Sequence, residues 1–599
     1  MMEIFIFFFI SSLITVFSGR FFLNLSGFKL NSNVISLSEQ GLYGLIFLSF
    51  LSLFFNFFFK IDQTLSTLIL FIPLIQVFLD RNYFSFNFIK KFFFHIIIIS
   101  LVCTFFISYD NVYRPDAGIY HLPYVKIIND FKIFFGAVTL NPVFGSTSIL
   151  QYTSSIFNNF IFKDVGVTIP LALISIYLID YFVREFFLKK TENIYKLFLF
   201  IVLSYIFLEM NRYSEYGNDN VGHLSLFYLV SLILRKDFNL QSNVNFKFFT
   251  LIALFVFLNK VFLFLTLLVP VLIWFKNKYY LSKKFYPIFS VFFFFLWIVK
   301  NIIISGCAIH PVSFTCNEKL EWYSNNSKFI ISANNLSQFA ELHAKGWSKI
   351  IDDKIYVNYD NDKKEKNEFL KNFNWIKSDK QSKNIKYGFY KLFNNYVYFI
   401  VIILLLFLFT KLHKEKNQRK ILQFEENIIL LISFFSSVIL FYKFPLGRYG
   451  TSYFVILIFY LIYFSFRSKL EIIDLKKINR SLSVLVIVFG SIFILKNVSR
   501  VILNYDTVYH QSPWPRIYEN KDNLKHLDSN SNLPVNFKNE YKDNVLKIYY
   551  VNKLNYWTSD RSITCMYNNS PCAQTSNHFD SFEIIKTSNN YYKIKLNKN

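Results

Sequence analysis

The chain has 599 residues, of which 53% are hydrophobic and 21% aromatic, and its mean hydropathy is +0.34. Soluble domains average about 45–50% apolar residues and do not gather them into long blocks. Here apolar runs of roughly 20 residues recur from end to end, which is the length that crosses about 30 Å of hydrocarbon. The composition therefore excludes a soluble globular protein and predicts a multi-pass membrane protein.

The net charge of +25 would suit a nucleic-acid partner, but the distribution of the charge does not. The lysines cluster in short loops between apolar runs, where the positive-inside rule expects them. The abundance of Lys, Asn, Ile and Phe is also typical of a genome-wide compositional bias. We therefore expect no nucleic-acid partner.

In chain order, the apolar runs predict an all-α membrane domain over residues 1–499, with about 12–14 transmembrane helices. The run at 246–275 is either one long helix or two short ones that turn at Asn259-Lys260. The first run lacks a basic n-region and a small-residue cleavage site, so we expect a helix and not a removed signal. The predicted helices cover 3–25, 40–59, 63–80, 89–108, 165–187, 192–211, 219–235, 246–258, 260–275, 285–304, 395–411, 421–442, 450–467 and 480–499.

Cysteines constrain the topology. Cys103 lies in an apolar run and is expected to be buried, whereas the other four form close pairs in polar segments, Cys307/Cys316 and Cys565/Cys572. Paired cysteines outside the membrane suggest disulfides, which persist only in an oxidising compartment; the alternative is four free thiols. If they are disulfides, the segments 305–394 and 500–599 both face outward.

The polar segment 109–164 lies on the same outward face only if the run at 246–275 crosses the membrane twice. Loop charge agrees, since the basic loops at 235–236, 276–284 and 411–420 then fall on the opposite, cytoplasmic side. The segment ends in "TSILQYTSSIFNNFIF", whose near-helical alternation predicts an amphipathic helix on the membrane surface. At the C-terminus, "KIYYVNKLNYW" is strand-like. We expect 500–599 to be a small mixed α/β external domain.

Four polar clusters fall at the ends of predicted membrane helices on this one face. Ionisable groups at such depths are costly and commonly mark a substrate path. An aspartate there can act as a general base on a hydroxyl, and arginine can hold a phosphate through paired hydrogen bonds. The clusters are Arg114, Asp116, Tyr120 and His121; Arg212, Glu215, Asp219 and His223; residues 300–311 with His310; and residues 443–450 with Arg448.

The residues of these clusters can also have purely structural roles. Asp116 follows a proline and can cap a turn, and Asp219 can be the N-cap of the helix that starts near 220. Arg212 and Arg448 can reach lipid headgroups along the membrane surface. The histidines suit structural hydrogen bonds. No His/Cys set has zinc spacing, so no metal site is expected, although Mg²⁺ held by carboxylates and phosphate stays open.

The loop "RPDAGIYHLPYVKIIND", together with a "YGND" segment, an "SGCAIHPVSFTC" segment and a late "RYG", resembles the GT-C superfamily of membrane glycosyltransferases. It is similar to bacterial multi-pass relatives of the protein mannosyltransferases and aminoarabinose transferases. The resemblance implies a GT-C fold in the bacterial inner membrane, a polyprenyl-phosphate sugar donor, a hydroxyl acceptor and an inverting displacement at the periplasmic face. No firm cofactor follows.

Within this resemblance, the loop aspartate of the family corresponds to Asp116, as the base that deprotonates the acceptor. Arg114, Tyr120, His121, Arg212, Asp219, Lys260, His310 and Arg448 are the candidates for donor contact. The chain departs from better-known members in the several helices before this loop, where they have one, so the N-terminal orientation stays open.

Two other classes remain. An O-antigen polymerase or ligase also has many helices and a large external loop, but its signature arginines are absent from 305–394. A transporter or flippase would show inverted repeats and acids in mid-helix. No repeat is visible, although Asp180 and Glu209 fall near predicted helix ends.

Overall fold

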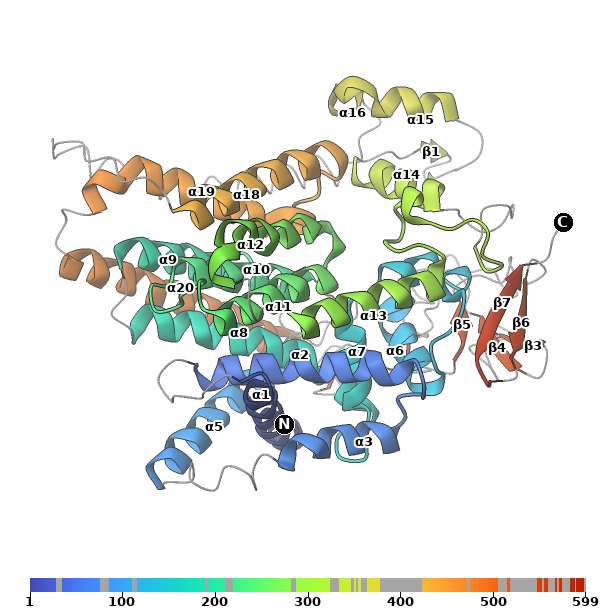
Figure 1. The fold of residues 1–599 in the computed structure, drawn as a ribbon, viewed down its shortest axis with the longest axis horizontal. Coiled ribbons are helices and arrows are strands. Elements are labelled where there is room, and N and C mark those ends of the chain that lie inside the picture. Colours follow the sequence, from blue (N-terminus) through green and yellow to red (C-terminus); the bar gives the residue numbers. More distant parts are fainter. Residues whose placement is uncertain are drawn as a thin grey trace.

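The computed structural model is mostly helical over the residues that it describes (Figure 1). These are residues 1–27, 35–75, 86–109, 116–188, 192–210, 219–281, 287–323, 333–345, 349–351, 354–356, 363–377, 423–470, 475–504, 514–515, 517, 547–551, 554–558, 566–567, 570–573, 582–587 and 589–596. All statements below refer to them.

α-Helices make up most of the described structure. In chain order they are α1 (Met2–Leu25), α2 (Leu37–Asn56), α3 (Gln63–Phe71), α5 (Phe86–Tyr109), α6 (Leu122–Asp130), α7 (Ile149–Phe157), α8 (Ile169–Phe187), α9 (Asn193–Leu208), α10 (Asp219–Leu234), α11 (Asn243–Asn259), α12 (Leu268–Leu281), α13 (Ile288–Ser305), α14 (Ala333–Ala344), α15 (Lys363–Leu370), α16 (Asn374–Lys377), α18 (Phe424–Lys443), α19 (Gly447–Leu470) and α20 (Leu475–Asn504).

Short helices and strands connect or flank these helices. The short helices are η1 (Ile72–Leu74), η3 (Ala117–His121), η4 (Ala137–Thr139), η5 (Pro142–Ser146), η6 (Asp164–Thr168), η7 (Val261–Leu267), η8 (Ser313–Thr315) and η9 (Lys371–Phe373). The strands are β1 (Lys349–Ile351), β2 (Lys354–Tyr356), β3 (Lys547–Val551), β4 (Leu554–Thr558), β5 (Cys572–Ala573), β6 (Phe582–Lys586) and β7 (Tyr592–Leu596). They pair as β1-β2, β3-β4-β5 and β6-β7.

Eight helices among the described residues are long and apolar enough to cross a membrane, and the protein is a multi-pass membrane protein. Five further apolar helices are shorter, including α9, α10, α11 and the η7–α12 pair. Most of the predicted helices are confirmed with small shifts of their ends, and the one at 260–275 consists of η7 and α12. Residues 76–80 of the helix predicted at 63–80, and the whole helix predicted at 395–411, lie outside the described residues. The strand prediction for "KIYYVNKLNYW" is also confirmed, by β3 and β4.

The ambiguous run at 246–275 is two helices. Lys260 has an extended backbone (φ −145°, ψ 103°) between α11 and η7, so the helix stops at Asn259. The chain then returns as α12, which packs against α11 and α18. The break therefore lies at the predicted residues, Asn259 and Lys260.

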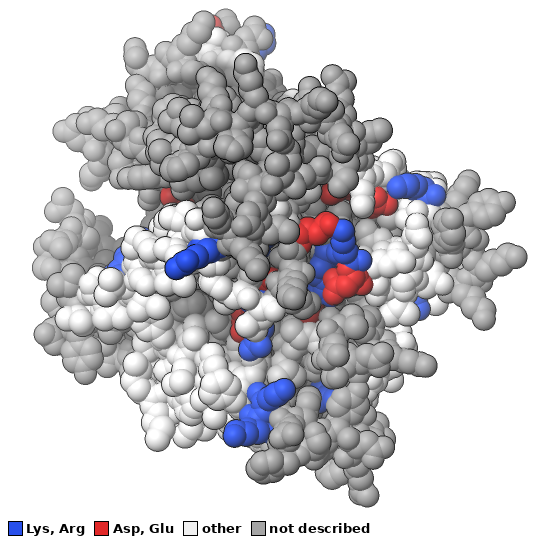
Figure 2. All heavy atoms as spheres, turned by 90° about the vertical axis from the view of Figure 1, so that its left-hand side faces the viewer, with Lys and Arg blue, Asp and Glu red and all other residues white. Residues whose placement is uncertain are grey.

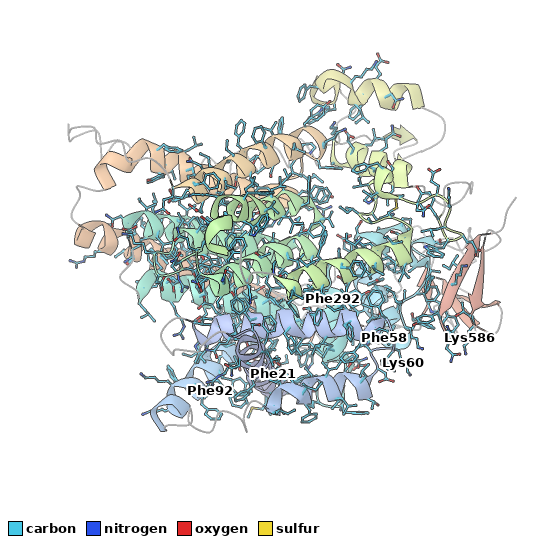
Figure 3. All side chains as sticks on the ribbon, viewed as in Figure 1. Phe21, Phe58, Lys60, Phe92, Phe292 and Lys586 are labelled. Atoms are coloured by element: carbon cyan, nitrogen blue, oxygen red, sulfur yellow. A yellow bond between two sulfur atoms is a disulfide. The ribbon has the colours of Figure 1, made fainter. Side chains whose placement is uncertain are left out.

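Close helix contact and aromatic packing form the core. A side-chain carbon at Gly19 would lie 1.7 Å from the carbonyl oxygen of Gln40, so α1 and α2 approach to backbone contact there. Small residues at such crossings replace the hydrophobic driving force that is absent in lipid. Elsewhere phenylalanines fill the interfaces, as Phe21 does against Phe47 with ring centroids 6.0 Å apart (Figure 3).

Helix α7 forms where "TSILQYTSSIF" predicts a helix, but it does not lie on a surface. All nine of its residues are buried. Its polar face contacts α2, where Thr153 and Ser155 bond to Ser49 at 2.6 Å and Ser52 at 2.9 Å. The alternation of polar and apolar residues therefore reflects hydroxyl contacts between helices, which sequence periodicity cannot distinguish from a water-facing side.

The three polar segments meet at one end of the bundle, on the right in Figure 1. Strand β7 bonds to the loop after α6, since Phe135 N donates to Tyr592 O at 3.0 Å and Ile594 N to Phe135 O at 3.1 Å. Lys593 forms an ion pair with Glu321 of the middle segment. Strand β7 therefore docks the C-terminal segment on the first polar segment.

The opposite end carries a charged network (Figure 2). There α8 and α10 end, and Arg235 is only 4% exposed, with Glu39 at 3.3 Å and Glu185 at 3.8 Å. Nearby, Arg184 Nε donates to Asp180 Oδ2 at 2.7 Å. The predicted basic loop at 235–236 thus lies at the end away from the polar segments.

Candidate functional site

The candidate site lies where four elements begin or break at the end of the bundle that carries the polar segments. It combines the start of η3, the first turn of α10, the break after α11 and the first turn of α19. These pieces carry Asp116, Asp219, Lys260 and Arg448, which are far apart in sequence. The sequence motifs of three polar clusters therefore meet in one place.

Lys260 is the buried centre of this meeting point. Its Nζ donates to Asp219 Oδ1 at 2.8 Å and to the carbonyl of Arg448, and the residue is 4% exposed. Gly222 makes room, since a side-chain carbon there would lie 3.0 Å from Lys260 Cβ. The ammonium is thus neutralised by Asp219, and Lys260 ties α10, α11 and α19 together.

His223 completes the junction between α10 and α19. Its Nε2 lies 2.9 Å from Arg448 O, and its Nδ1 lies 2.8 Å from Ser452 Oγ. A carbonyl can only accept, so Nε2 carries the proton and Nδ1 accepts from the Ser452 hydroxyl. The ring is buried and fully engaged, which gives His223 the structural role that the sequence left open.

Asp116 lies at the exposed edge of the site. It is exposed and directly precedes η3, without a side-chain hydrogen bond to the helix end. Tyr120 lies one turn later, near both Asp116 and Asp219. Burial is the main cause that raises the pKa of the Tyr120 hydroxyl, the two carboxylates raise it further, and Arg448 lowers it. Tyr120 therefore remains protonated between two acids and a guanidinium.

Arg448 supplies the exposed positive charge of the site. Its Nη2 donates to the Tyr449 hydroxyl at 3.4 Å, and its guanidinium lies 5.2 Å from the Tyr449 ring centroid. The backbone of Arg448 is held by Lys260 and His223, whereas the side chain projects outward. Such an arginine can bind an anion with little rearrangement.

His121 faces inward and is a structural residue. Gln151 Oε1 accepts from Ser148, so Gln151 Nε2 donates to His121 Nδ1 at 2.6 Å. Burial lowers the pKa of His121 to about 3, so the ring is neutral at pH 7. Its position lets it shape η3, next to Tyr120 at a ring-centroid distance of 4.2 Å.

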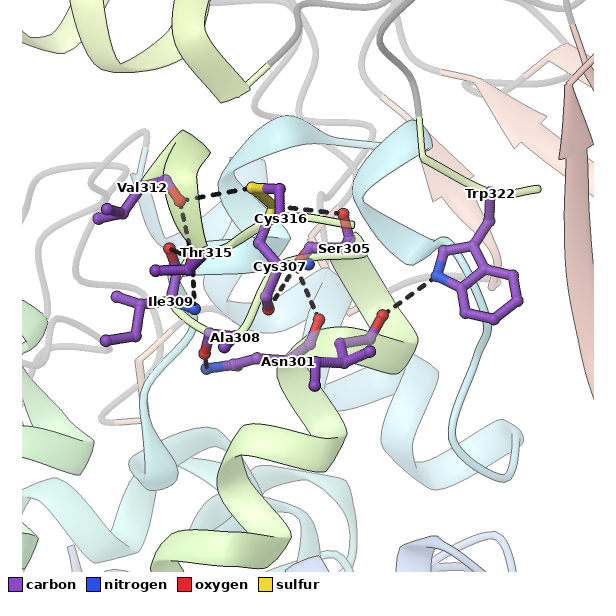
Figure 4. The surroundings of a disulfide bond; sticks show 10 residues. Asn301, Ser305, Cys307, Ala308, Ile309, Val312, Thr315, Cys316 and Trp322 are labelled. Carbon is purple, nitrogen blue, oxygen red and sulfur yellow. Dashed lines mark hydrogen bonds between the residues drawn. A yellow bond between two sulfur atoms is a disulfide. The ribbon is translucent and has the colours of Figure 1, made fainter. Parts of the chain in front are cut away.

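His310 lies in the third cluster, which the disulfide Cys307–Cys316 closes into a loop (Figure 4). The disulfide prediction for this pair is confirmed. Thr315 Oγ1 donates to Val312 O at 2.7 Å inside the loop, and Asn301 Nδ2 anchors it from α13 through Ala308 O at 2.9 Å. The His310 ring packs on Gly145, where a side-chain carbon would be 2.3 Å from Nδ1.

Several predicted residues fall outside the described part of the chain, namely Arg114, Arg212, Glu215 and Cys565. Cys572 lies in β5, and Cys103 is buried in α5 as predicted. Among the described residues, no three His, Cys, Asp or Glu side chains come together as metal ligands.

Sequence reasoning missed residues that form hydrogen bonds to the elements that carry the site. Tyr449 was visible only as part of the "RYG" segment, Ser452 lies two residues after that segment, and Gln151 was visible only as part of an amphipathic run. Tyr567 has no local motif at all, yet its backbone neighbour Met566 N donates to Gly118 O at 2.9 Å. Contacts over such separations leave no trace in sequence spacing.

Fold and site define a multi-pass membrane protein with a polar site at one end of its helices. A family model described as a domain of unknown function (DUF8201) matches residues 1–455, and the chain belongs to this family. No curated protein and no solved structure matches the chain. The matched range includes Asp116, Asp219, Lys260 and Arg448 of the site, but not Met566 and Tyr567.

Proposed function

We propose that the protein is a GT-C-type glycosyltransferase that moves a sugar from a polyprenyl-phosphate donor to a hydroxyl acceptor at the external face of the bacterial inner membrane. The observation that carries the proposal is the placement of an exposed aspartate, Asp116, and an exposed arginine, Arg448, around Tyr120. One group can take a proton while the other holds a phosphate.

In the proposed reaction, the Asp116 carboxylate takes the proton of the acceptor hydroxyl. The acceptor oxygen then forms its bond to the anomeric carbon of the sugar on the face opposite the phosphate. The bond between that carbon and the phosphate oxygen breaks, and the electron pair leaves with the polyprenyl phosphate. Arg448 stabilises the charge that builds on this leaving group. Configuration inverts, because a single displacement occurs.

The remaining residues position these two groups. Lys260 and His223 bond the carbonyl of Arg448, and Asp219 neutralises Lys260. An arginine on so fixed a backbone loses less freedom when it binds an anion. Lys260 is then a positioning residue, although the sequence suggested direct donor contact.

A transporter is the second candidate, and two observations favour it. Transporter sites use discontinuous helices, as at the Asn259–Lys260 break, and acids within helices, as in the Asp180–Arg184 pair. The O-antigen polymerase or ligase alternative gains no comparable observation.

The discriminating experiment supplies purified protein in nanodiscs with a panel of polyprenyl-phosphate hexoses and analyses the lipid products. The transferase releases polyprenyl phosphate in the presence of a hydroxyl acceptor, and Arg448→Ala raises KM for the donor. Arg500→Ala is the matched control, because Arg500 bonds Asn497 on α20, away from the site. Intact donor with every acceptor, in the wild type, would reject the transferase.

A further inference from the structure

The inner side of α13 carries a buried lysine that the proposed reaction does not use. Lys300 lies five residues before the end of α13, and none of its surface is exposed. Among the residues that the structure describes, nothing accepts a hydrogen bond from its Nζ. The side-chain nitrogen instead lies 3.4 Å from the centroid of the Trp297 ring.

Two more buried nitrogen atoms near Lys300 are also unpaired among the described residues. Trp297 is 1% exposed and its indole Nε1 donates to no described group. His310 is 3% exposed and its Nδ1 also has no described partner. Burial, and then the nearby Lys300 charge, lower the pKa of His310 to about 4, so its ring is neutral at pH 7. The acceptor Asn301 Oδ1 is unpaired as well.

Such a group of unpaired donors is unfavourable in a finished protein interior. Buried polar groups are hydrogen-bonded in the large majority of cases, and a buried charge is normally paired. The contact of Lys300 with the Trp297 ring recovers only part of the desolvation cost. An anion would satisfy the ammonium and an indole N–H together.

The location indicates which anion could arrive. Lys300 is about 7.5 Å along the helix from its end at Ser305, and this end lies beside the polar segments. The opposite side of α13 is a lipid-facing surface, with Val291 61% and Phe295 59% exposed. The donor cluster adjoins η5 through Gly145, and Asn141, just before η5, bonds Ile119 O next to the candidate site at 3.0 Å.

We propose that Lys300, Trp297 and His310 form a second binding site, which takes the phosphate oxyanion of a phosphate ester. The site stands whether or not the protein is a glycosyltransferase. In the structure the Lys300 side chain lies against the Trp297 ring, and on binding it turns from the ring to the anion. The anion can belong to an isoprenoid phosphate, to a phospholipid or to free phosphate.

The test measures the thermal midpoint of purified full-length protein in neutral detergent, with added inorganic phosphate, farnesyl phosphate or phosphatidylglycerol. Wild type should be stabilised by at least one of the three, and the stabilising compound identifies the source of the phosphate. Lys300→Met should weaken the apparent affinity about tenfold or more, as expected for a lost charged hydrogen bond. Without ligand, Lys300→Met should be no less stable than wild type, because an unpaired buried polar group is removed.

Controls separate this site from the Arg448 site and from general charge effects. Lys60→Met removes an exposed lysine near the same end, with 57% of its side chain exposed, and should respond as wild type does. Arg448→Ala removes the phosphate contact of the proposed active site, and the part of the response that Lys300→Met abolishes should remain in it. If Lys300→Met does not fold, His310→Gln provides the same comparison. The proposal is overturned if no compound stabilises wild type, or if Lys300→Met and His310→Gln both respond as wild type.

Discussion

The hydroxyl of Tyr567 donates to Asn129 Oδ1 at 2.8 Å and accepts from Asn158 Nδ2 at 2.6 Å. Tyr567 belongs to the C-terminal segment, beyond the range matched by the family model, whereas Asn129 lies in the last turn of α6 and Asn158 follows the end of α7. Met566 bonds the backbone of η3 two residues after Asp116. The C-terminal segment thus holds the loop that presents the proposed base.

Tyr567→Phe should destabilise the protein by about 1–3 kcal/mol, because Asn129 loses a donor in a buried position. The thermal midpoint in detergent measures this loss. Tyr442→Phe is the control, since Tyr442 is 40% exposed and should shift the midpoint little. An unchanged midpoint in Tyr567→Phe would show that the docking of this segment contributes nothing.

Lys260 and Asp219 should behave as a coupled pair. Lys260→Met leaves the Asp219 carboxylate without its cation and should cost about 3 kcal/mol, as for other broken buried pairs. Adding Asp219→Asn should restore part of this loss, giving a coupling of about 1 kcal/mol or more in a double-mutant cycle. Additive losses would mean that the 2.8 Å contact carries no energy.

Stability should fall in mild acid. The folded-state pKa values of His121 and His310 are lowered to about 3 and about 4, below an unfolded value of about 6.5. The unfolded chain therefore binds more protons below pH 6.5, so the stabilisation is complete above that pH and is lost as the pH falls toward 4. His310→Gln should flatten the dependence of the thermal midpoint on pH between 6.5 and 4; an identical slope would contradict this.

The disulfide predicts a labelling pattern. In denatured, non-reduced protein, Cys103 should react with a maleimide, while Cys307 and Cys316 should react only after reduction. Mass spectrometry of the peptides gives the answer. Free alkylation of both Cys307 and Cys316 in non-reduced material would remove the disulfide, and with it the argument that this end faces an oxidising compartment.

The sequence predicted well those features that recur along the chain or that depend only on neighbouring residues. Apolar runs located the helices, and the polar residues Asn259-Lys260 located the break, because both signals lie within one segment. It could not distinguish buried from surface polar faces, as in α7, whose hydroxyls bond to α2. Nor could it show that Lys260 is paired with Asp219, or that Tyr567 reaches Asn129, since these contacts depend on how distant elements pack.

Lys300 is a second residue whose surroundings could not be predicted from the sequence. In the sequence it is one lysine near the end of an apolar run, where it would be expected to reach water. In the structure it faces the protein interior, beside Trp297. Which side of a helix faces lipid is set by its neighbours, and α13 has apolar residues all round.

The most direct test of the central claim compares Asp116→Asn with wild type in the transfer assay. The substitution keeps shape and removes the base, so turnover should fall by about 100-fold or more while donor affinity and thermal midpoint stay near wild type. Asp164→Asn, in the same polar segment, is the control and should retain activity, since an asparagine oxygen can still accept from Val165 N. Wild-type turnover by folded Asp116→Asn would contradict the account.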